Sequence, residues 1–243
     1  MISFFAVLFG LVFGSFYNVI IYRIPNNISI AKGRSFCPKC KTQIPWYRNI
    51  PVLTYLLQKG KCSVCSFHIP VQYLVVEILT ATLWYWAFNN YSFQEALLFV
   101  WVSGILTTIA FIDSKHYIIP ISLIISIIVG EIGYLFIHTD KIAHAIYGAI
   151  FGTLYLGLVF GLTSVLFKKQ TMGYGDLLLV FVAGIWLGPI NSLIMIFTAS
   201  IVALTTYIVS SIVNGIKKNK QIPFGLYLSL TAIIIKIINI KLF

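Results

Sequence analysis

Long apolar runs separated by short polar segments make up most of the chain. A helix needs about 20 apolar residues to cross the roughly 30 Å hydrocarbon core of a bilayer. The sixth run is short and is broken by Gly188-Pro189, so it predicts either a partial span or a tight hairpin with the seventh run. We therefore expect an all-α polytopic membrane protein with about six to eight transmembrane helices. The runs cover residues 2–21, 71–88, 95–112, 119–137, 143–166, 177–188, 192–213 and 223–240.

The composition excludes an ordinary water-soluble domain. Hydrophobic residues make up 59% of the 243 residues and charged residues only 9%, which is too little charge for a soluble surface of this size. The first run lacks a basic start and leads directly into a basic segment, so we interpret it as a retained first span rather than a removable signal peptide.

The basic residues predict the orientation in the membrane. Segment 22–70 holds eight Lys and Arg residues and no acid, and basic loops stay in the cytoplasm. Alternation then places the loops at 113–118, 167–176 and 214–222 on the same side, whereas the opposite loops hold only Lys141. This pattern explains the net charge of +11 by orientation and contact with anionic membrane lipid, not by nucleic-acid binding. The other basic residues on the inner side are Lys115, Lys168, Lys169, Lys217, Lys218 and Lys220.

All four cysteines lie in the predicted cytoplasmic segment. Cys37 and Cys40 form one C-x₂-C pair, and Cys62 and Cys65 form a second pair, with 21 residues between the two pairs. This spacing is typical of a zinc knuckle, and four thiolates fill the coordination shell of a structural zinc ion. Disulfides are disfavoured in a reducing cytosol, and the alternative is four unliganded thiols. His68 is not needed as a ligand.

Two aspartates end or begin apolar runs on the same predicted side of the membrane. Asp113 follows residues 109–112, and Asp176 closes the run Gly173-Tyr174-Gly175-Asp176. Two facing carboxyl groups share one proton, so one can take a proton from water while the other polarises a carbonyl group. Gly173 and Gly175 would allow a substrate strand to approach the backbone closely.

Each aspartate also has a structural alternative. Asp113 could pair with Lys115 or His116 at a helix end, and Asp176 could be the N-cap of the next helix. Of the other acids within apolar runs, Glu77 could orient the zinc loop, pair with a buried base or face a polar seam. Glu131 is expected to face another helix, with no assigned role.

Several motifs together resemble the bacterial type IV prepilin peptidases, the bifunctional leader peptidase/N-methyltransferases of the GxGD-type aspartyl protease family. They are the run GSFYNVIIYRIP at 14–25, the two cysteine pairs with WYRNIPVL at 46–53 between them, and Val76-Glu77. They continue with Asp113 followed by Ile119-Pro120, the run at 173–176, and Pro223-Phe224-Gly225. A more distant likeness is to presenilin-type intramembrane proteases.

The resemblance implies an endopeptidase with Asp113 and Asp176 as catalytic residues. Members of this family remove a basic leader from pilin-like precursors on the cytoplasmic face of the inner membrane. Many then methylate the new N-terminus with S-adenosylmethionine, although no residue of this sequence can be assigned to binding it. The precursors serve pili, type II secretion or competence. A different substrate for a presenilin-like protease, and a non-enzymatic zinc-bearing scaffold, are the alternatives.

These expectations divide the chain into three parts. Residues 1–21 form a first transmembrane helix, residues 22–70 a cytoplasmic zinc-binding loop domain with four cysteine ligands, and residues 71–243 a polytopic transmembrane catalytic domain.

Overall fold

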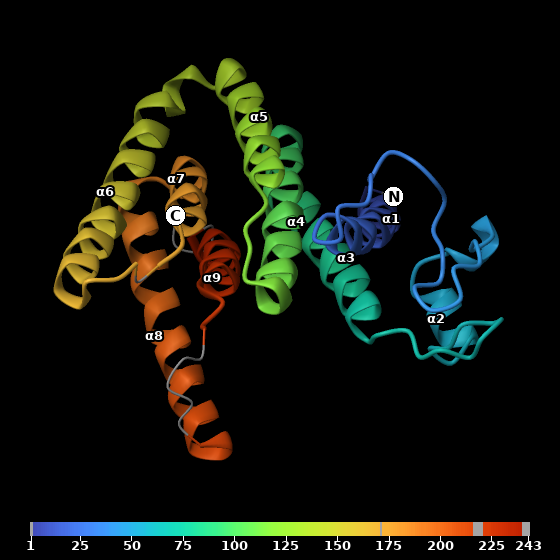
Figure 1. Ribbon diagram of the computed structural model, residues 1–243. Helices are drawn as coiled ribbons and strands as arrows, with labels where there is room; N and C mark the ends of the chain where they lie inside the picture. Colours follow the sequence, from blue (N-terminus) through green and yellow to red (C-terminus); the bar gives the residue numbers. More distant parts are fainter. Residues whose placement is uncertain (1, 171, 216–220, 240–243) are drawn as a thin grey trace. The chain divides into compact units, whose positions relative to one another are not determined.

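The computed structural model describes residues 2–170, 172–215 and 221–239, and within these ranges it contains helices and no strand (Figure 1). Isolated bridges join Phe36 to Gln43 and Lys61 to His68. Short 3₁₀ turns occupy Trp46–Arg48 and Thr139–Lys141. The α-helices are α1 (Ile2–Arg23), α2 (Leu53–Leu57), α3 (Gln72–Asn90), α4 (Phe93–His116), α5 (Ile121–Ile137), α6 (Ile142–Phe167), α7 (Tyr174–Leu187), α8 (Pro189–Asn214) and α9 (Phe224–Asn239).

Each of the predicted apolar runs forms a helix, so the prediction of an all-helical membrane protein is confirmed. Within the described residues, four helical segments are long and apolar enough to cross a bilayer, while α5, α7 and α9 are shorter apolar helices. Lys217, Lys218, Lys220 and the end of the run at 223–240 lie outside the described residues. The four long segments are Ile2–Arg23, Phe93–His116, Thr139–Phe167 and Pro189–Val213.

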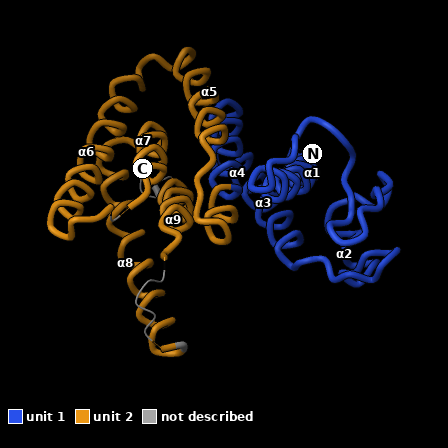
Figure 2. Tube along the Cα trace, viewed as in Figure 1, with its two compact units in different colours: residues 1–108 blue, residues 109–243 orange. Residues whose placement is uncertain are grey.

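The chain forms two compact units, unit 1 at Met1–Thr108 and unit 2 at Ile109–Phe243, and the boundary between them along the chain falls within α4 (Figure 2). In unit 1, α1 packs along α3. A Cβ atom at Gly10 would lie 2.6 Å from the Cα atom of Ala81, and one at Gly14 would lie 2.7 Å from the Cα atom of Glu77. The small residues therefore let the two helix backbones touch, as is common between membrane helices.

In unit 2, α7 contacts α5, α6, α8 and α9. It has 14 residues, so it extends only about 21 Å, less than the thickness of a bilayer core. Gly188 alone connects it to α8 and has a φ of +82°, which disfavours other residues. The short sixth run is thus a partial span joined tightly to the seventh.

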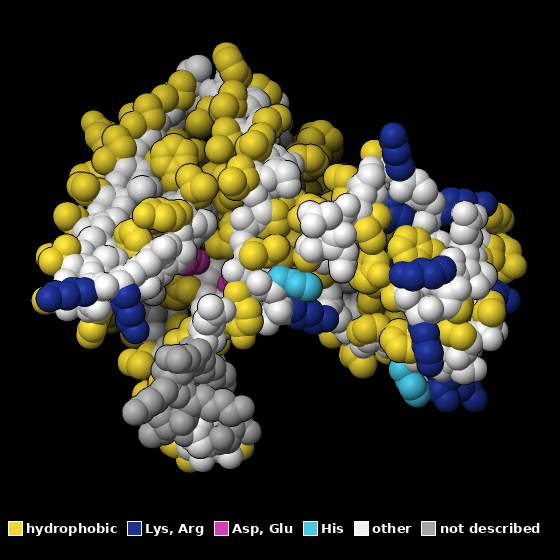
Figure 3. Space-filling model, viewed as in Figure 1, with side chains coloured by type: hydrophobic (Ala, Val, Ile, Leu, Met, Phe, Trp, Pro, Cys, Tyr) yellow, Lys and Arg dark blue, Asp and Glu magenta, His cyan; other side chains and the backbone are white. Residues whose placement is uncertain are grey.

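The outward face of α6 shows why this fold needs lipid. One row of exposed side chains recurs at every fourth residue and is large and apolar throughout: Ile146, Ile150, Leu154, Leu158 and Leu162. Hydrophobic side chains cover most of the visible surface of unit 2 in Figure 3. A continuous apolar face of this kind is stable in contact with acyl chains and not in water.

Candidate functional site

Asp113 lies in the last turn of α4, with its carboxyl group buried. Its Oδ2 atom accepts a hydrogen bond of 2.9 Å from the backbone N–H of Leu226, and the amide of Gly225 is a second donor. Both amides belong to the first turn of α9, where N–H groups have no partner within the helix. The carboxyl group is therefore held by the start of α9.

Asp176 lies in the first turn of α7 and is also buried. The N-cap of this helix is Gly173, so Asp176 does not occupy the N-cap position. Its carboxyl group instead accepts a hydrogen bond from the backbone amide of Gly173, while its own N–H donates to the Gly173 carbonyl at 3.2 Å. This reciprocal arrangement resembles a capping box, and it fixes the carboxyl group at the start of α7.

The fold brings these two aspartates together within unit 2, although 63 positions separate them in the sequence. Their carboxyl groups interact electrostatically. Ile119, in the link between α4 and α5, provides a common contact: a Cβ atom at Gly175 would lie 3.1 Å from the Ile119 Cβ atom, and one at Gly225 would lie 2.8 Å from its Cδ1 atom. Gly175, next to Asp176, and Gly225, which binds Asp113, thus both pack against the Ile119 side chain.

The start of α9 is the part of this site that sequence reasoning missed. Pro223-Phe224-Gly225 was recognised as a motif but had no role. A Cβ atom at Gly225 would lie 3.0 Å from the Asp113 Oδ2 atom, so this glycine leaves room for the carboxyl group. The sequence does show a glycine, Gly225, at the start of an apolar run, but only the fold shows that it lies against Asp113.

The two glycines before Asp176 differ in their surroundings. Gly175 lies inside the first turn of α7 and packs against Ile119. At Gly173 an added Cβ atom would be 3.5 Å from the Asp176 Oδ2 atom, an ordinary contact distance. That these glycines admit a substrate strand stays a prediction.

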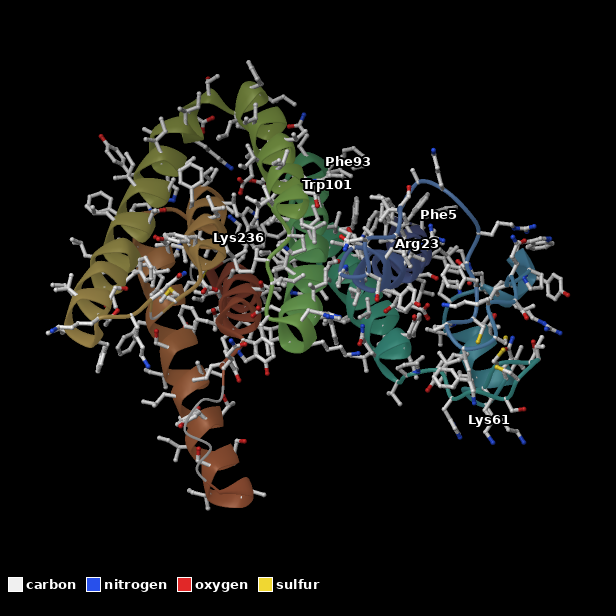
Figure 4. The ribbon with its side chains drawn as sticks, in the orientation of Figure 1. Phe5, Arg23, Lys61, Phe93, Trp101 and Lys236 are labelled. Atoms are coloured by element: carbon white, nitrogen blue, oxygen red, sulfur yellow. The ribbon has the colours of Figure 1, made fainter. Side chains whose placement is uncertain are left out.

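The four cysteines form a compact cluster in unit 1, beside α2 (Figure 4). Their sulfur atoms all lie within 4.8 Å of one another, and the Sγ atoms of Cys37 and Cys65 are 3.7 Å apart. Zinc–sulfur bonds of about 2.3 Å in a tetrahedron give sulfur–sulfur distances of about 3.8 Å. The donor set and its spacing therefore fit a metal ion of this kind.

The two cysteine pairs are built as a repeat with an offset of 25 residues. In the first, Lys41 N–H donates to the Cys37 carbonyl and Ile44 N–H to the Ser35 carbonyl; in the second, Ser66 donates to Cys62 and Ile69 to Gly60. Lys41 and Ser66, each directly after the second cysteine of its pair, have φ values of +58° and +54°. The sequence carries the same repeat, since C-x₂-C-x₃-I-P occurs at 37–45 and again at 62–70, but the sequence analysis used only the cysteine pairs.

Hydrogen bonds favour the metal-binding thiolate form at Cys40 and Cys62, whereas burial and hydrogen bonds with the other three thiols raise the pKa of Cys65 to about 11. A hydrogen bond with the Thr42 side chain, aided by the Thr42 backbone, lowers the pKa of Cys40 to about 6. Backbone amides of Cys65 and Val64 lower the pKa of Cys62.

Arg23 organises the start of the cysteine loop, a role that the sequence did not reveal. This residue ends α1 and is 3% exposed (Figure 4). Its guanidinium group donates four hydrogen bonds of 2.8 to 3.2 Å to backbone carbonyls. A buried cation is stable only when such partners are present, so this loop folds around Arg23. The acceptors are the carbonyls of Ser29, Lys32, Gly33 and Arg34.

The two remaining acids within helices have different surroundings. Glu77 on α3 accepts a 2.8 Å hydrogen bond from the Val52 amide, so it contacts the loop that carries the cysteines. Glu131 on α5 faces the helix bundle, as expected, and interacts electrostatically with Lys236 of α9. Lys236 also donates a 2.8 Å hydrogen bond to the carbonyl of Trp186 near the end of α7. These contacts connect α5, α7 and α9.

Comparison with known proteins covers nearly the whole chain. Residues 8–91 match the bacterial peptidase A24 N-terminal domain, and residues 97–209 match the type IV leader peptidase family. No solved structure matches the chain.

Several relatives are named prepilin leader peptidase/N-methyltransferase. The one from Dichelobacter nodosus is 31% identical, over 93% of this chain and 88% of its own length. Those from Neisseria gonorrhoeae and Pseudomonas aeruginosa are each 30% identical, over 95% and 92% of this chain and 88% and 86% of their own lengths. With matches of this extent in both halves, the chain is a membrane peptidase that belongs to the type IV leader peptidase family.

Proposed function

We propose that this protein is an aspartyl endopeptidase of the bacterial inner membrane that removes the basic leader from type IV pilin-like precursors. Cleavage takes place on the cytoplasmic face, and methylation of the new N-terminus follows. The observation that carries the proposal is the meeting of Asp113 and Asp176 around Ile119. The basic segment 22–70 supports the cytoplasmic orientation.

The surroundings of the two aspartates support a division of work between them. Two carboxyl groups in electrostatic contact hold one proton more readily than they both ionise. The ionised group takes a proton from water, and the protonated group donates a hydrogen bond to the scissile carbonyl. Because backbone amides hold one side of each carboxyl group, both are positioned before substrate arrives.

We assign zinc to the cysteine cluster as a structural ion held by Cys37, Cys40, Cys62 and Cys65. Four thiolates leave no open position for substrate, so this ion stabilises the loop and takes no part in cleavage. Methylation requires S-adenosylmethionine, which supplies an electrophilic methyl group.

The test is cleavage of a co-expressed pilin-like precursor. Asp113→Asn and Asp176→Asn should each lower cleavage by at least about 1,000-fold while the protein still accumulates, since removing one group disables the pair. Asp140→Asn, an exposed position in the turn before α6, is the matched control and should cleave normally.

Three outcomes separate the proposal from its alternatives. Full activity of either dyad variant would refute the assignment. Equal cleavage of membrane segments that lack a basic leader followed by glycine would favour a presenilin-like protease with other substrates. Normal cellular function with both aspartates neutralised would favour a non-enzymatic scaffold.

A further inference from the structure

Helix α2 of unit 1 turns its leucines away from the rest of the loop. On its inner side, Thr54 and Tyr55 line a cavity of about 330 Å³ beside the cysteine turns, and Glu77 of α3 lines it as well. Residues three and four positions apart lie on one face of a helix, so the leucines of α2 share the opposite, outer face. They are Leu53, Leu56 and Leu57, with 59%, 58% and 83% of their surface exposed.

The residues just before α2 extend this apolar surface. Trp46 and Tyr47 are 74% and 53% exposed, and their rings are in edge-to-face contact with centroids 5.8–5.9 Å apart at most. Ile50 is 43% exposed, and its carbonyl accepts a hydrogen bond from the Thr54 N–H, so the turn and the helix form one short compact segment. All six side chains come from residues 46–57, between the two cysteine pairs, and together they form the apolar loop surface: Trp46, Tyr47, Ile50, Leu53, Leu56 and Leu57.

Exposed bases flank the apolar loop surface on both sides along the chain. Lys39 and Lys41 belong to the first cysteine turn, Lys59 and Lys61 follow α2, and all four side chains are exposed. Lys and Arg side chains lie among hydrophobic ones on the visible face of this part of unit 1 (Figure 3). Segment 22–70 contains no acid, so this surface has a positive potential, which repels both a second copy of itself and a basic leader peptide.

The loop starts and ends at one end of a pair of membrane helices. Helix α1 is long and apolar enough to span a bilayer, and it packs along α3. The two helices are antiparallel, because Gly10 lies against Ala81 whereas Gly14 lies against Glu77. The loop therefore leaves α1 and enters α3 at the same membrane surface, and it stays close to the lipid there.

A hydrogen bond also holds the loop back along this helix pair. The Val52 N–H, in the middle of segment 46–57, donates a 2.8 Å hydrogen bond to the Glu77 carboxyl group. Helix α3 begins at Gln72, so Glu77 lies about 8 Å along its axis. The lipid headgroup layer is roughly 5–8 Å thick on each side of the hydrocarbon core. Segment 46–57 is thus folded back along α3 by about the thickness of that layer.

These features match the surface of an anionic bilayer. Tryptophan and tyrosine concentrate at membrane interfaces, leucines enter the acyl-chain boundary, and lysines attract anionic headgroups. We propose that the apolar loop surface docks on the anionic phospholipid of the chain's own membrane, with its leucines and Trp46 below the headgroups and the flanking lysines on the phosphates. The inference rests on the cytoplasmic orientation in the proposed function, because the cytoplasmic leaflet carries the negative surface potential.

The test measures how well acrylamide, a neutral quencher in the water phase, reaches Trp46. The zinc-loaded full-length protein is placed singly in bilayer discs of phosphatidylcholine, with or without phosphatidylglycerol. Trp46 is the one tryptophan of segment 22–70, so subtracting the signal of Trp46→Phe isolates its fluorescence from that of the other four. We expect quenching of Trp46 to fall by about twofold or more when phosphatidylglycerol is present, and high salt to reverse part of that protection.

Two pairs of variants separate the apolar part of the contact from the charged part. Leu53→Gln/Leu57→Gln should abolish most of the protection of Trp46, whereas the control Leu53→Ile/Leu57→Ile keeps the apolar area and should retain it. Lys59→Gln/Lys61→Gln should lose the effect of phosphatidylglycerol, whereas Lys59→Arg/Lys61→Arg keeps the charge and should retain it. All of these positions are exposed, so zinc content should stay at the wild-type level and report that the loop is folded.

Three results would overturn the inference. The first is equal quenching of Trp46 with and without phosphatidylglycerol. The second is protection only in discs that hold two chains, which would make a second copy the occupant. The third is protection only after a pilin-like precursor is added, which would make the substrate the occupant.

The outcomes also separate this inference from the proposed function. If the wild type cleaves precursors and both dyad variants are inactive, but Trp46 is equally quenched in both kinds of disc, the inference alone fails. If Trp46 is protected but a dyad variant cleaves normally, the peptidase assignment fails and the lipid contact stands. Trypsin added outside spheroplasts should not cleave at Lys59 or Lys61; cleavage there would overturn the cytoplasmic orientation and, with it, the choice of leaflet.

Discussion

Gly225→Ala tests the dyad geometry with a single methyl group. The added Cβ atom would lie 3.0 Å from the Asp113 Oδ2 atom, 3.2 Å from its Cγ atom and 2.8 Å from the Ile119 Cδ1 atom. Ordinary contacts between such atoms are about 3.5–4.0 Å, so at least one neighbour must move. Ile119 can rotate its terminal methyl group away, whereas Asp113 cannot retreat without lengthening its 2.9 Å hydrogen bond to Leu226.

The cost of that displacement sets the expected effect. A hydrogen bond to a charged group contributes about 1.5–3 kcal/mol, and each 1.36 kcal/mol corresponds to a tenfold change in rate. Gly225→Ala should therefore slow precursor cleavage by about 10- to 100-fold. Thermal stability should fall by up to about 3 kcal/mol as well, because the same hydrogen bond stabilises the folded protein. The assay is a time course of precursor cleavage by purified protein in detergent or bilayer discs.

Two further variants make the result decisive. Gly161→Ala, in α6 with nothing within 4 Å of the added methyl group, controls for a glycine replacement in a membrane helix and should cleave normally. Ile119→Val removes the Cδ1 atom and so relieves only the contact with Ile119. A wild-type rate for Gly225→Ala, or full recovery in the Gly225→Ala/Ile119→Val double variant, would refute the role given to Asp113 in this contact.

Three other predictions concern stability and metal content. Metal analysis of the purified wild-type protein should find one zinc ion per chain, and Cys40→Ser should contain much less. Val64→Ala is the control, because the Val64 side chain lies in the second cysteine turn but is 61% exposed, and its zinc content should be unchanged. Arg23→Lys should destabilise the cysteine loop by about 3 kcal/mol, because an ammonium group cannot reach four carbonyls. The measurement is limited proteolysis, in which cleavage at 24–34 should become faster. Arg34→Lys, at an exposed position, is the control and should resist proteolysis like the wild type. Gly184→Ala would place a methyl group 2.5 Å from the backbone carbonyl oxygen of Gly148 on α6. The variant should therefore be less stable by about 1–3 kcal/mol. An unchanged melting temperature would contradict this contact between α6 and α7.

The sequence by itself determined the helices and the two cysteine turns. Apolar runs of about 20 residues require lipid and internally paired backbones, so each predicted run became a helix. The C-x₂-C pairs are local motifs, in which each pair of thiols is brought together by one tight turn. Even the short sixth helix was visible, because glycine followed by proline interrupts a helix at that point.

Only the tertiary structure decided what the buried charged groups contact. The sequence placed Asp113 and Asp176 at the same predicted depth, but it did not show that the start of α9 holds Asp113 or that Ile119 joins the two sides. It also did not show that Arg23 folds the loop, or that Glu77 faces a cavity. Periodicity depends on neighbours a few residues apart, whereas these contacts join segments that become neighbours only when the helices pack.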